Sequence, residues 1–299
     1  MTSTFFKLLA TASLALSVGT ATAQEDRFAK TVITAEKVAD NLYVLFGDGG
    51  NIGLSVGEDG AFMIDDQYAP LTPRILAAIK KLTDQPVKYV VNTHWHGDHT
   101  GGNENLGKRD SVIVAHDHVR DRMSVDQDRG NGRVTKASPK PALPVITFDH
   151  QASLHLNGDE ARAVHYANAH TDGDSVVFFE KSNVVHMGDI MFYKRFPFID
   201  DFSGGTIDGV IAAVTDVISR SNADTVVIPG HGPVTNLDGL NEYLDLLVKA
   251  RTRVNALKVA GKSKDEAIAA KPMADYAKVW NWNFINEDSF VKLVYVTLP

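Results

Sequence analysis

Residues 91–102 read VNTHWHGDHTGG, and they place three histidines and one aspartate within the six positions from His94 to His99. The chain has only 11 histidines among its 299 residues, so packing gives no reason for this concentration. On an extended or turning backbone, residues i and i+2 point the same way. His94 and His96 can therefore hold one ion, while Asp98 and His99 face elsewhere and can hold a second. The stretch predicts a metal-binding loop.

Three further residues repeat one design, in which an apolar strand is followed by a metal-ligand residue type beside a glycine or a turn. His170 ends the run VHYANAH, Asp189 ends VVHMGD, and His231 lies in VVIPGHG. In α/β folds, the loops that follow buried strands carry functional residues. A single histidine or aspartate of this kind is more often structural, but the repetition favours one shared site.

Strand and helix patterns surround these loops. Residues 41–66 alternate apolar runs with glycine-rich turns, which predicts three strands. Residues 124–142 are polar and are expected to form an exposed loop or lid. The spacing of apolar residues predicts helices over 71–82, 206–220 and 237–261. No break in composition divides residues 24–299, so we expect one α+β domain in which helices cover the outer faces of two packed sheets.

Composition argues against several kinds of partner and ligand. The formal net charge is −7, and lysine and arginine form no stripe, which disfavours a nucleic-acid partner. The chain has no cysteine, so any metal site must use histidine and carboxylate alone. The sequence does not specify an oligomeric state.

The first 23 residues have the features of a secretory signal peptide. One lysine precedes a short run of apolar and small residues, and the tripeptide ATA stands just before Gln24. This run is shorter than the ~20 apolar residues that a membrane span needs. We therefore expect a signal peptide over 1–23, a periplasmic or secreted protein, and no membrane span after cleavage.

Four short motifs, in this order and at these separations, resemble the metallo-β-lactamase superfamily over nearly all of residues 24–299. They are HWHGDH, AHTDGD, MGD and PGHG, at residues 94–99, 169–174, 187–189 and 229–232. The resemblance implies a metallo-β-lactamase fold, which is a four-layer αβ/βα sandwich of two mixed β-sheets packed face to face, with helices outside. It also implies a dinuclear metal site with two Zn(II) per chain, or iron or manganese in their place.

The resemblance also implies a role for each ligand. The first metal would be bound by His94, His96 and His170. The second would be bound by Asp98, His99 and His231, and Asp189 would bridge both. Asp98 and Asp189 are the expected catalytic carboxylates, acting with metal-bound hydroxide. The chemistry expected is attack of this hydroxide on the carbonyl carbon of a small-molecule substrate.

The substrate class stays open between lactones, β-lactams and esters. Many β-lactam-opening relatives carry cysteine where Asp189 stands, and Asp189 is similar to the pattern of glyoxalase II and acyl-homoserine lactonases. The export signal argues against glyoxalase II, whose glutathione thioester is cytosolic. Phe192 lies near the place where the β-lactamases hold a cation, and Lys194 or Arg195 could substitute for it. A non-catalytic metal-binding or partner-binding module on the same fold is the alternative.

Residues around the predicted site divide into three groups. Carboxylates that could hold the free ring nitrogens of the ligands are Asp65, Asp66, Asp172 and Asp174. Segments expected to set specificity are 47–51, the loop of Tyr68, 124–142 and 192–205. Histidines expected to be structural are His116, His118, His150, His155, His165 and His186.

Overall fold

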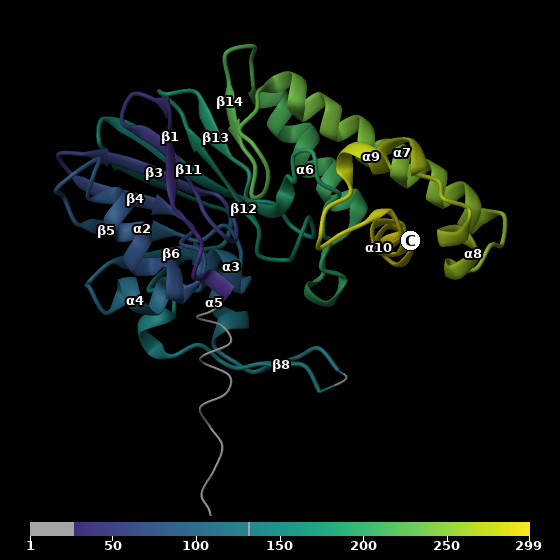
Figure 1. Cartoon of the computed structure of the whole chain (residues 1–299), viewed down its shortest axis with the longest axis horizontal. Helices are drawn as coiled ribbons and strands as arrows, with labels where there is room; N and C mark the ends of the chain where they lie inside the picture. Colours follow the sequence, from purple (N-terminus) through teal and green to yellow (C-terminus); the bar gives the residue numbers. More distant parts are fainter. Residues whose placement is uncertain (1–26, 131) are drawn as a thin grey trace, which may run out of the picture.

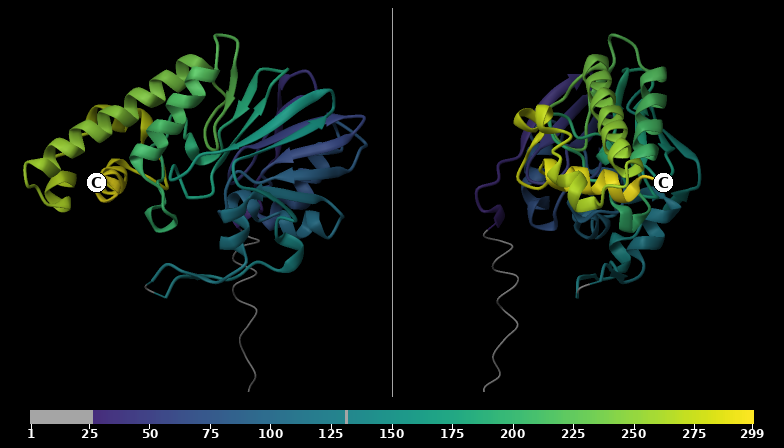
Figure 2. Two further views of the ribbon diagram at one scale, coloured as in Figure 1. Left: turned by 180° about the vertical axis from the view of Figure 1, so that it is seen from behind. Right: turned by 90° about the vertical axis from the view of Figure 1, so that its right-hand side faces the viewer.

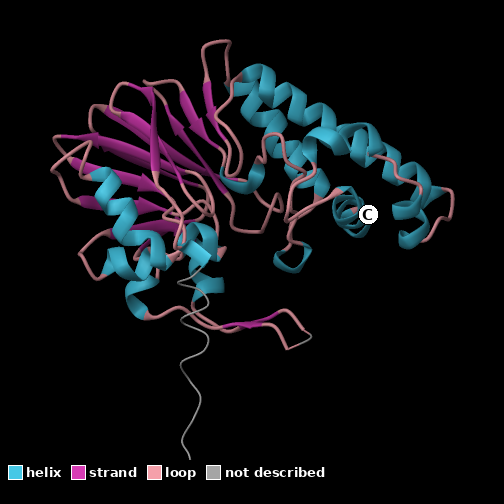
Figure 3. Ribbon diagram, viewed as in Figure 1, coloured by secondary structure: helices cyan, strands magenta, loops and turns pink. Residues whose placement is uncertain are grey.

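Two β-sheets packed face to face form the centre of the molecule, and helices cover both outer faces (Figure 1). The computed structural model describes residues 27–130 and 132–299, so the predicted signal peptide lies outside the described residues. The predicted α+β four-layer sandwich is confirmed. Figure 3 shows the strands of both sheets gathered between two groups of helices.

The larger sheet has seven strands in the order β1-β2-β3-β4-β5-β6-β9. Its first four strands pair antiparallel, whereas β4, β5, β6 and β9 run parallel to one another, so the sheet is mixed. The strands are β1 (Thr34–Ala39), β2 (Leu42–Phe46), β3 (Ile52–Gly57), β4 (Gly60–Ile64), β5 (Val87–Val91), β6 (Val112–His116) and β9 (Ile146–Phe148).

The smaller sheet has five strands in the order β10-β11-β12-β13-β14. The pairs are antiparallel except for β13 and β14, which are parallel. The strands are β10 (Gln151–Leu156), β11 (Asp159–His165), β12 (Ser175–Phe179), β13 (Val184–His186) and β14 (Val226–Ile228). Parallel neighbours end at the same edge of a sheet, so the loops after β13 and β14 meet there.

Alternation of side chains along the strands explains why both faces of each sheet are apolar. In β4, Phe62 and Ile64 face the other sheet, whereas Met63 packs toward the helices. In β12, Phe179 faces the first sheet and Val176 packs toward the helices. Neither face of these strands meets water, which accounts for the continuous apolar runs in the sequence.

Each sheet has its own layer of helices. On the first sheet, α2 (Thr72–Ile79) and α4 (Asn103–Gly107) contribute Ile75, Ile79 and Leu106 to the buried cluster. On the second sheet, α6 (Ile207–Arg220), α7 (Leu237–Val259) and α10 (Glu287–Thr297) form the cover. The described residues also form the α-helices α3 (Gly97–Thr100), α5 (Asp117–Met123), α8 (Lys264–Ala269) and α9 (Ala274–Trp280).

The C-terminal helices extend beyond the sheets, as the left view of Figure 2 shows for α7. Its predicted range of 237–261 agrees with the observed Leu237–Val259, and Gly261 follows with a φ of 78°, a left-handed conformation that ends helices. Within residues 27–130 and 132–299, no helix combines the length and apolar character needed to cross a bilayer.

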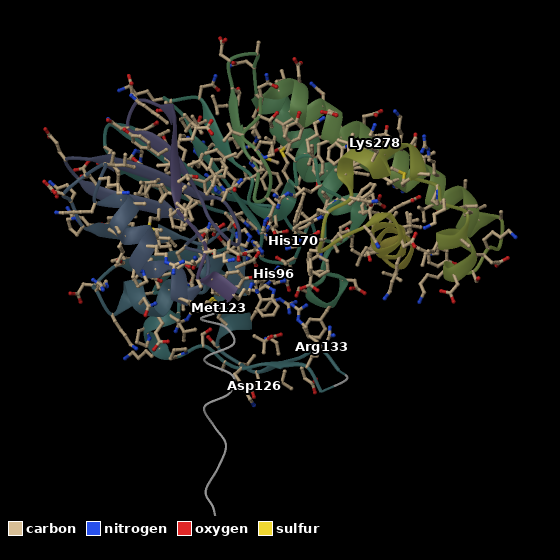
Figure 4. All side chains as sticks on the ribbon, viewed as in Figure 1. His96, Met123, Asp126, Arg133, His170 and Lys278 are labelled. Carbon is tan, nitrogen blue, oxygen red and sulfur yellow. The ribbon has the colours of Figure 1, made fainter. Side chains whose placement is uncertain are left out.

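Segment 124–142 is largely exposed, as predicted, and its described residues include short regular elements. It contains a short antiparallel hairpin, β7 (Gln127–Asp128) and β8 (Val134–Thr135), and a 3-10 turn at Lys140–Ala142. This hairpin projects from the sandwich and carries Arg133 (Figure 4). The sequence did not predict these strands, because two residues are too few to show an alternation of apolar and polar residues.

Candidate metal centre

Every predicted ligand lies in a segment that follows a strand. His94 and His96 follow β5, and the backbone then turns into α3, which carries Asp98 and His99. His170 follows β11, Asp189 lies in the 3-10 turn Gly188–Ile190 after β13, and His231 follows β14. The seven side chains form two groups, and the ligand atoms within each group lie within 4.8 Å of one another.

The first group consists of His94, His96 and His170, with Asp189 beside them. Nδ1 of His96 lies 3.1 Å from Nε2 of His94 and 3.0 Å from Nε2 of His170. Figure 4 labels His96 and His170, which lie next to each other at the end of the sheets. Three imidazole nitrogens thus converge on one point, as they do around a tetrahedral zinc ion.

The second group consists of Asp98, His99 and His231. Nε2 of His231 lies 3.3 Å from Oδ2 of Asp98 and 3.4 Å from Nε2 of His99. Asp98 is the partly exposed member, whereas His99 and His231 are buried. Two nitrogens and one carboxylate oxygen therefore converge on a second point.

Asp189 stands between the two groups and turns one oxygen toward each. Oδ2 lies 3.7 Å from Nε2 of His94 and 3.6 Å from Nε2 of His170. Oδ1 lies 3.1 Å from Nε2 of His99 and 3.4 Å from Nε2 of His231. Oδ1 is buried and accepts no hydrogen bond with good geometry. A buried carboxylate oxygen without such a bond, facing imidazole nitrogens, fits a cation on either side of the carboxylate.

Two glycines permit this close approach. A Cβ atom on Gly230 would lie 2.1 Å from Oδ1 of Asp189, and one on Gly50 would lie 2.1 Å from Cε1 of His99. Any larger residue at either position would displace a ligand side chain. The backbone of the loops after β2 and β14 is therefore part of the wall that holds the ligands in place.

The ring nitrogens that face away from the two groups have hydrogen-bond acceptors. His96 donates from Nε2 to Asp200, 2.8 Å away, and His170 donates from Nδ1 to the Phe198 carbonyl, also at 2.8 Å. Nδ1 of His94 lies 3.0 Å from the Thr93 hydroxyl. These bonds orient each ring and leave the opposite nitrogen unprotonated toward the centre.

Among the four carboxylates predicted to support the ligands, Asp65 is the one that contacts a ligand ring. It accepts hydrogen bonds from Nδ1 of His99 at 2.7 Å, from the Thr93 backbone N–H at 2.7 Å and from the Thr93 hydroxyl at 2.8 Å. Its φ of 63° is a left-handed conformation that an aspartate adopts at some cost. The surrounding hydrogen bonds hold the residue in that conformation.

The other three carboxylates predicted to support the ligands do not contact a ligand ring. Asp66 accepts from the Gly102 backbone N–H, Asp172 accepts from Arg122, and Asp174 accepts from Thr171. Sequence reasoning instead missed Asp200, which lies in FPFIDDFSGG with no ligand motif nearby. Its position after an aromatic run gave no signal, because two adjacent aspartates are common in turns.

The charges of the second group favour a cation. Burial alone would lower the pKa of His99, but Asp189, Asp65 and Asp98 raise it well above its usual value. Burial would likewise lower the pKa of His231, but Asp189 and Asp98 raise it to about 9. With raised pKa values, these two rings favour the charged form when no metal ion is bound, and their charges offset part of the charge of the three carboxylates. A metal ion would have to displace those protons, and the negative field that holds them would hold the ion.

A cavity of about 890 Å³ opens onto this centre. Its wall includes Asp98, Asp189 and His231, so a bound molecule can reach both groups. The loops predicted to set specificity contribute to it through Gly47–Gly49, Tyr68, Arg129, Phe192, Arg195 and Phe198. Trp282 and Phe284, from the segment between α9 and α10, also line the cavity, and no sequence pattern had identified them.

The histidines expected to be structural lie outside both groups. His116 and His165 stack with ring centroids 3.6 Å apart and planes 11° apart. His116 donates from Nε2 to the Asp149 carbonyl and accepts at Nδ1 from the His118 backbone N–H. His186 donates to the Asn51 carbonyl between the sheets. These rings satisfy local hydrogen bonds and take no part in the centre.

The sequence model described as the metallo-beta-lactamase superfamily matches residues 45–231. A hydroxyacylglutathione hydrolase from Nitrosococcus oceani is 26% identical over 171 residues, which are 56% of this chain and 57% of that protein. A beta-lactamase-like protein 2 homolog from Caenorhabditis elegans is 22% identical over 204 residues, covering 67% of this chain and 62% of that one. This chain thus spans only about three fifths of the length of these relatives.

Solved structures share the fold at low sequence identity. A metallo-beta-lactamase from Pontibacter korlensis superposes with a TM-score of 0.59 at 20% identity, covering 72% of this chain and 99% of that one. A stereoselective inverting sec-alkylsulfatase from a Pseudomonas species gives a TM-score of 0.66 at 16% identity, covering 91% of this chain and 51% of that one. The latter comparison extends the likeness in fold to most of the described chain.

Asp65→Asn should weaken zinc binding by about 10- to 100-fold, because the carboxylate that orients His99 is lost. Asp172→Asn is the matched control, since the carboxylate of Asp172 accepts hydrogen bonds from Arg122 instead of a ligand ring, and the change should leave zinc affinity unchanged. Competition with a chromophoric chelator measures both affinities. Equal zinc affinity in the two variants would show that Asp65 does not support the centre.

His116 should make the metal-free protein less stable in acid. Burial, followed by the neighbouring His165, lowers the pKa of His116 to about 4. An unfolded histidine titrates near 6.5, so the unfolded state binds more protons between pH 6.5 and 4, and the folded state loses stability as pH falls through that window. Urea unfolding at several pH values should therefore show a shallower loss of unfolding free energy for His116→Gln than for wild type.

The exposed His150 provides the control for this measurement. His150→Gln should reproduce the pH dependence of the wild-type protein. Metal-free protein is used throughout, so that release of metal in acid does not contribute. A slope for His116→Gln that equals the wild-type slope would contradict the assignment of this acid sensitivity to His116.

Proposed function

Since the chain belongs to the metallo-beta-lactamase superfamily, we propose that it is an exported, dinuclear zinc-dependent hydrolase. Its substrate would be a small molecule with a hydrolysable carbonyl, of the lactone, β-lactam or ester type. The observation that carries this proposal is Asp189, whose two oxygens face two separate groups of imidazole nitrogens. Export rests on the predicted signal peptide at residues 1–23.

The donor atoms fit the proposed ions. His94, His96 and His170 would hold one ion, Asp98, His99 and His231 the other, and Asp189 would bridge them. Nitrogen and oxygen donors suit zinc, and iron or manganese accept the same ligands. When bound, such ions supply Lewis acidity at the carbonyl oxygen and lower the pKa of water, so that a nucleophile forms near neutral pH.

The residues of the chain would position both the ions and the substrate. Asp65, Asp200 and the Phe198 carbonyl hold the rings of His99, His96 and His170 in fixed orientations. Partial burial would raise the pKa of Asp98, but His99 and His231 lower it below its usual value. It therefore stays ionised and presents a negative charge to a cation instead of a proton to the substrate. The cavity holds the substrate against this preformed arrangement.

The names of the similar proteins do not select one substrate. They cover a hydroxyacylglutathione hydrolase, a metallo-beta-lactamase and an alkylsulfatase. What the solved structures share with this chain is the fold. A panel of lactones, β-lactams, esters and thioesters, assayed with and without a chelator, therefore tests the proposal most broadly.

Asp189→Ala should lower kcat/KM at least about 100-fold, the size of effect that loss of a supporting partner alone can produce. Metal analysis should find about two ions per wild-type chain and fewer in this variant. His116→Ala is the control and should keep both its metal content and its activity, since His116 lies outside the centre.

Two results would contradict the proposal. Full activity in Asp189→Ala would remove the bridging role. Zinc-loaded protein that hydrolyses nothing in the panel, while still binding two ions, would favour the non-catalytic binding module instead.

A further inference from the structure

Arg129, in the hairpin formed by β7 and β8, reaches a buried carboxylate that contacts a candidate metal ligand. Its Nη2 donates to Oδ2 of Asp200 at 3.0 Å, and the same oxygen accepts from Nε2 of His96 at 2.8 Å. The Ser203 hydroxyl donates to this oxygen as well, at 2.6 Å. One carboxylate oxygen thus joins the hairpin, the ligand ring and the 3-10 turn Asp201–Ser203.

The negative charge of Asp200 is costly in this position, because its side chain is only 2% exposed. A histidine that binds a metal ion is neutral, so His96 can donate a hydrogen bond to Asp200 without balancing its charge. Within residues 27–130 and 132–299, Arg129 is the one lysine or arginine that forms an ion pair with Asp200. A buried charge that loses its partner is strongly destabilised. Arg129 therefore stabilises the carboxylate that orients His96.

Two aromatic rings hold the guanidinium of Arg129. Its central carbon lies 5.1 Å from the ring centroid of Trp95 and 5.3 Å from that of Phe202. Trp95 belongs to the HWHGDH motif, and its indole N–H donates to the Ser203 hydroxyl at 3.1 Å. An arginine that lies over aromatic rings keeps its in-plane N–H donors for a carboxylate. The same contacts therefore fix both the arginine and the turn that carries its partner.

The backbone of the hairpin places Arg129 at this point. The Arg129 N–H donates to the Arg133 carbonyl at 2.9 Å, next to the paired strands β7 and β8. At the base of the hairpin, the Ser138 N–H donates to the Met123 carbonyl at 2.7 Å, which ties the returning chain to the end of α5. The hairpin is thus fastened to α5 at its base and to Asp200 through Arg129.

Two neighbouring arginines have different surroundings. Arg122, on α5, donates from two nitrogens to the carboxylate of Asp172, each at 2.7 Å. Arg133 is exposed, and among residues 27–130 and 132–299 its side chain forms no ion pair. Figure 4 shows Arg133 on the projecting hairpin, whereas His96 lies at the end of the sheets. Arg133 therefore offers a matched control for the charge of Arg129.

We propose that Arg129 is a positioning residue for the first metal site, which holds the ring of His96 through Asp200 and couples the hairpin to metal binding. This role rests on the proposed function, because it requires that His96 bind a metal ion. Such coupling is reciprocal. Whatever the docked hairpin adds to metal affinity, a bound metal ion adds to the docking of the hairpin.

Arg129→Gln should weaken zinc binding about five- to tenfold, less than the ~10- to 100-fold effect of losing a direct partner of a ligand. Loss of a positive charge beside a metal site would by itself strengthen zinc binding, so a weaker affinity reports the lost orientation of His96. Arg129→Lys should recover part of the affinity, because an ammonium can pair with Asp200 but lacks the planar fork. Competition with a chromophoric chelator measures these affinities.

Arg133→Gln removes one positive charge from the same hairpin and should bind zinc as the wild-type protein does. Equal changes in Arg133→Gln and Arg129→Gln would attribute the effect to net charge and overturn the positioning role. Unchanged or tighter zinc binding by Arg129→Gln would overturn it as well. The thermal midpoint of each metal-free variant verifies that it is folded.

A double-mutant cycle tests whether Arg129 acts through Asp200. Asp200→Asn alone should weaken zinc binding at least about tenfold, because the carboxylate that orients His96 is lost. Adding Arg129→Gln to Asp200→Asn should then cause no further loss, since the two changes remove one shared interaction. Losses that simply multiply would show that Arg129 does not act through Asp200.

The mobility of the hairpin tests the coupling from the other side. The chain has no cysteine, so Val134→Cys, at a side chain that is 42% exposed on β8, provides a single site for a fluorescent label. Zinc should raise the anisotropy of this label, and Arg129→Gln should abolish the rise. Anisotropy that zinc leaves unaltered in the labelled protein with Arg129 intact would contradict the coupling.

These measurements need no hydrolysis and therefore fail independently of the proposed function. Zinc affinity that depends on Arg129, in a protein that hydrolyses nothing, retains the positioning role and overturns the hydrolase. Hydrolysis by a protein whose zinc affinity does not depend on Arg129 retains the hydrolase and overturns the positioning role. A protein that binds no zinc overturns both.

Discussion

The structure depends on one buried carboxylate held between four imidazole rings. Asp189 is almost fully shielded from water, and a charge in that position is costly unless other charges match it. Burial would raise its pKa, but His99 and His231 lower that pKa well below the usual value. The site therefore requires positive charge beside Asp189, which protons on His99 and His231 supply in the metal-free protein and which metal ions would supply in the proposed holoenzyme.

That requirement explains features of the residues around Asp189. Gly50 and Gly230 are small because the side chains of His99 and Asp189 occupy the space that a Cβ would fill. Asp65 adopts a left-handed backbone conformation and holds both Thr93 and His99. The sandwich brings these pieces together because the parallel strands β13 and β14 end at one edge, where the loop after β5 meets them.

The sequence predicted the architecture and the seven candidate ligands because both depend on local patterns. A ligand residue beside a glycine after an apolar strand is visible within about ten positions, and it occurs four times. Asp200, Trp282 and Phe284 could not be found in this way. They reach the site from segments without such a pattern, and only the packing of the C-terminal helices brings Trp282 against His231. Of the four carboxylates predicted to support ligands, only Asp65 accepts a hydrogen bond from a ligand ring. The sequence could not separate it from the others, because an aspartate in such a loop can equally well form an ion pair, as Asp172 does, or stabilise a turn, as Asp174 does.

A crystal structure of zinc-loaded protein, with anomalous diffraction recorded at the zinc edge, tests the two-ion arrangement most directly. Two anomalous peaks are expected, one among His94, His96 and His170 and one among Asp98, His99 and His231, with an oxygen of Asp189 directed at each. A single peak, or two peaks that leave Asp189 uncoordinated, would contradict the bridging role on which the proposed chemistry rests.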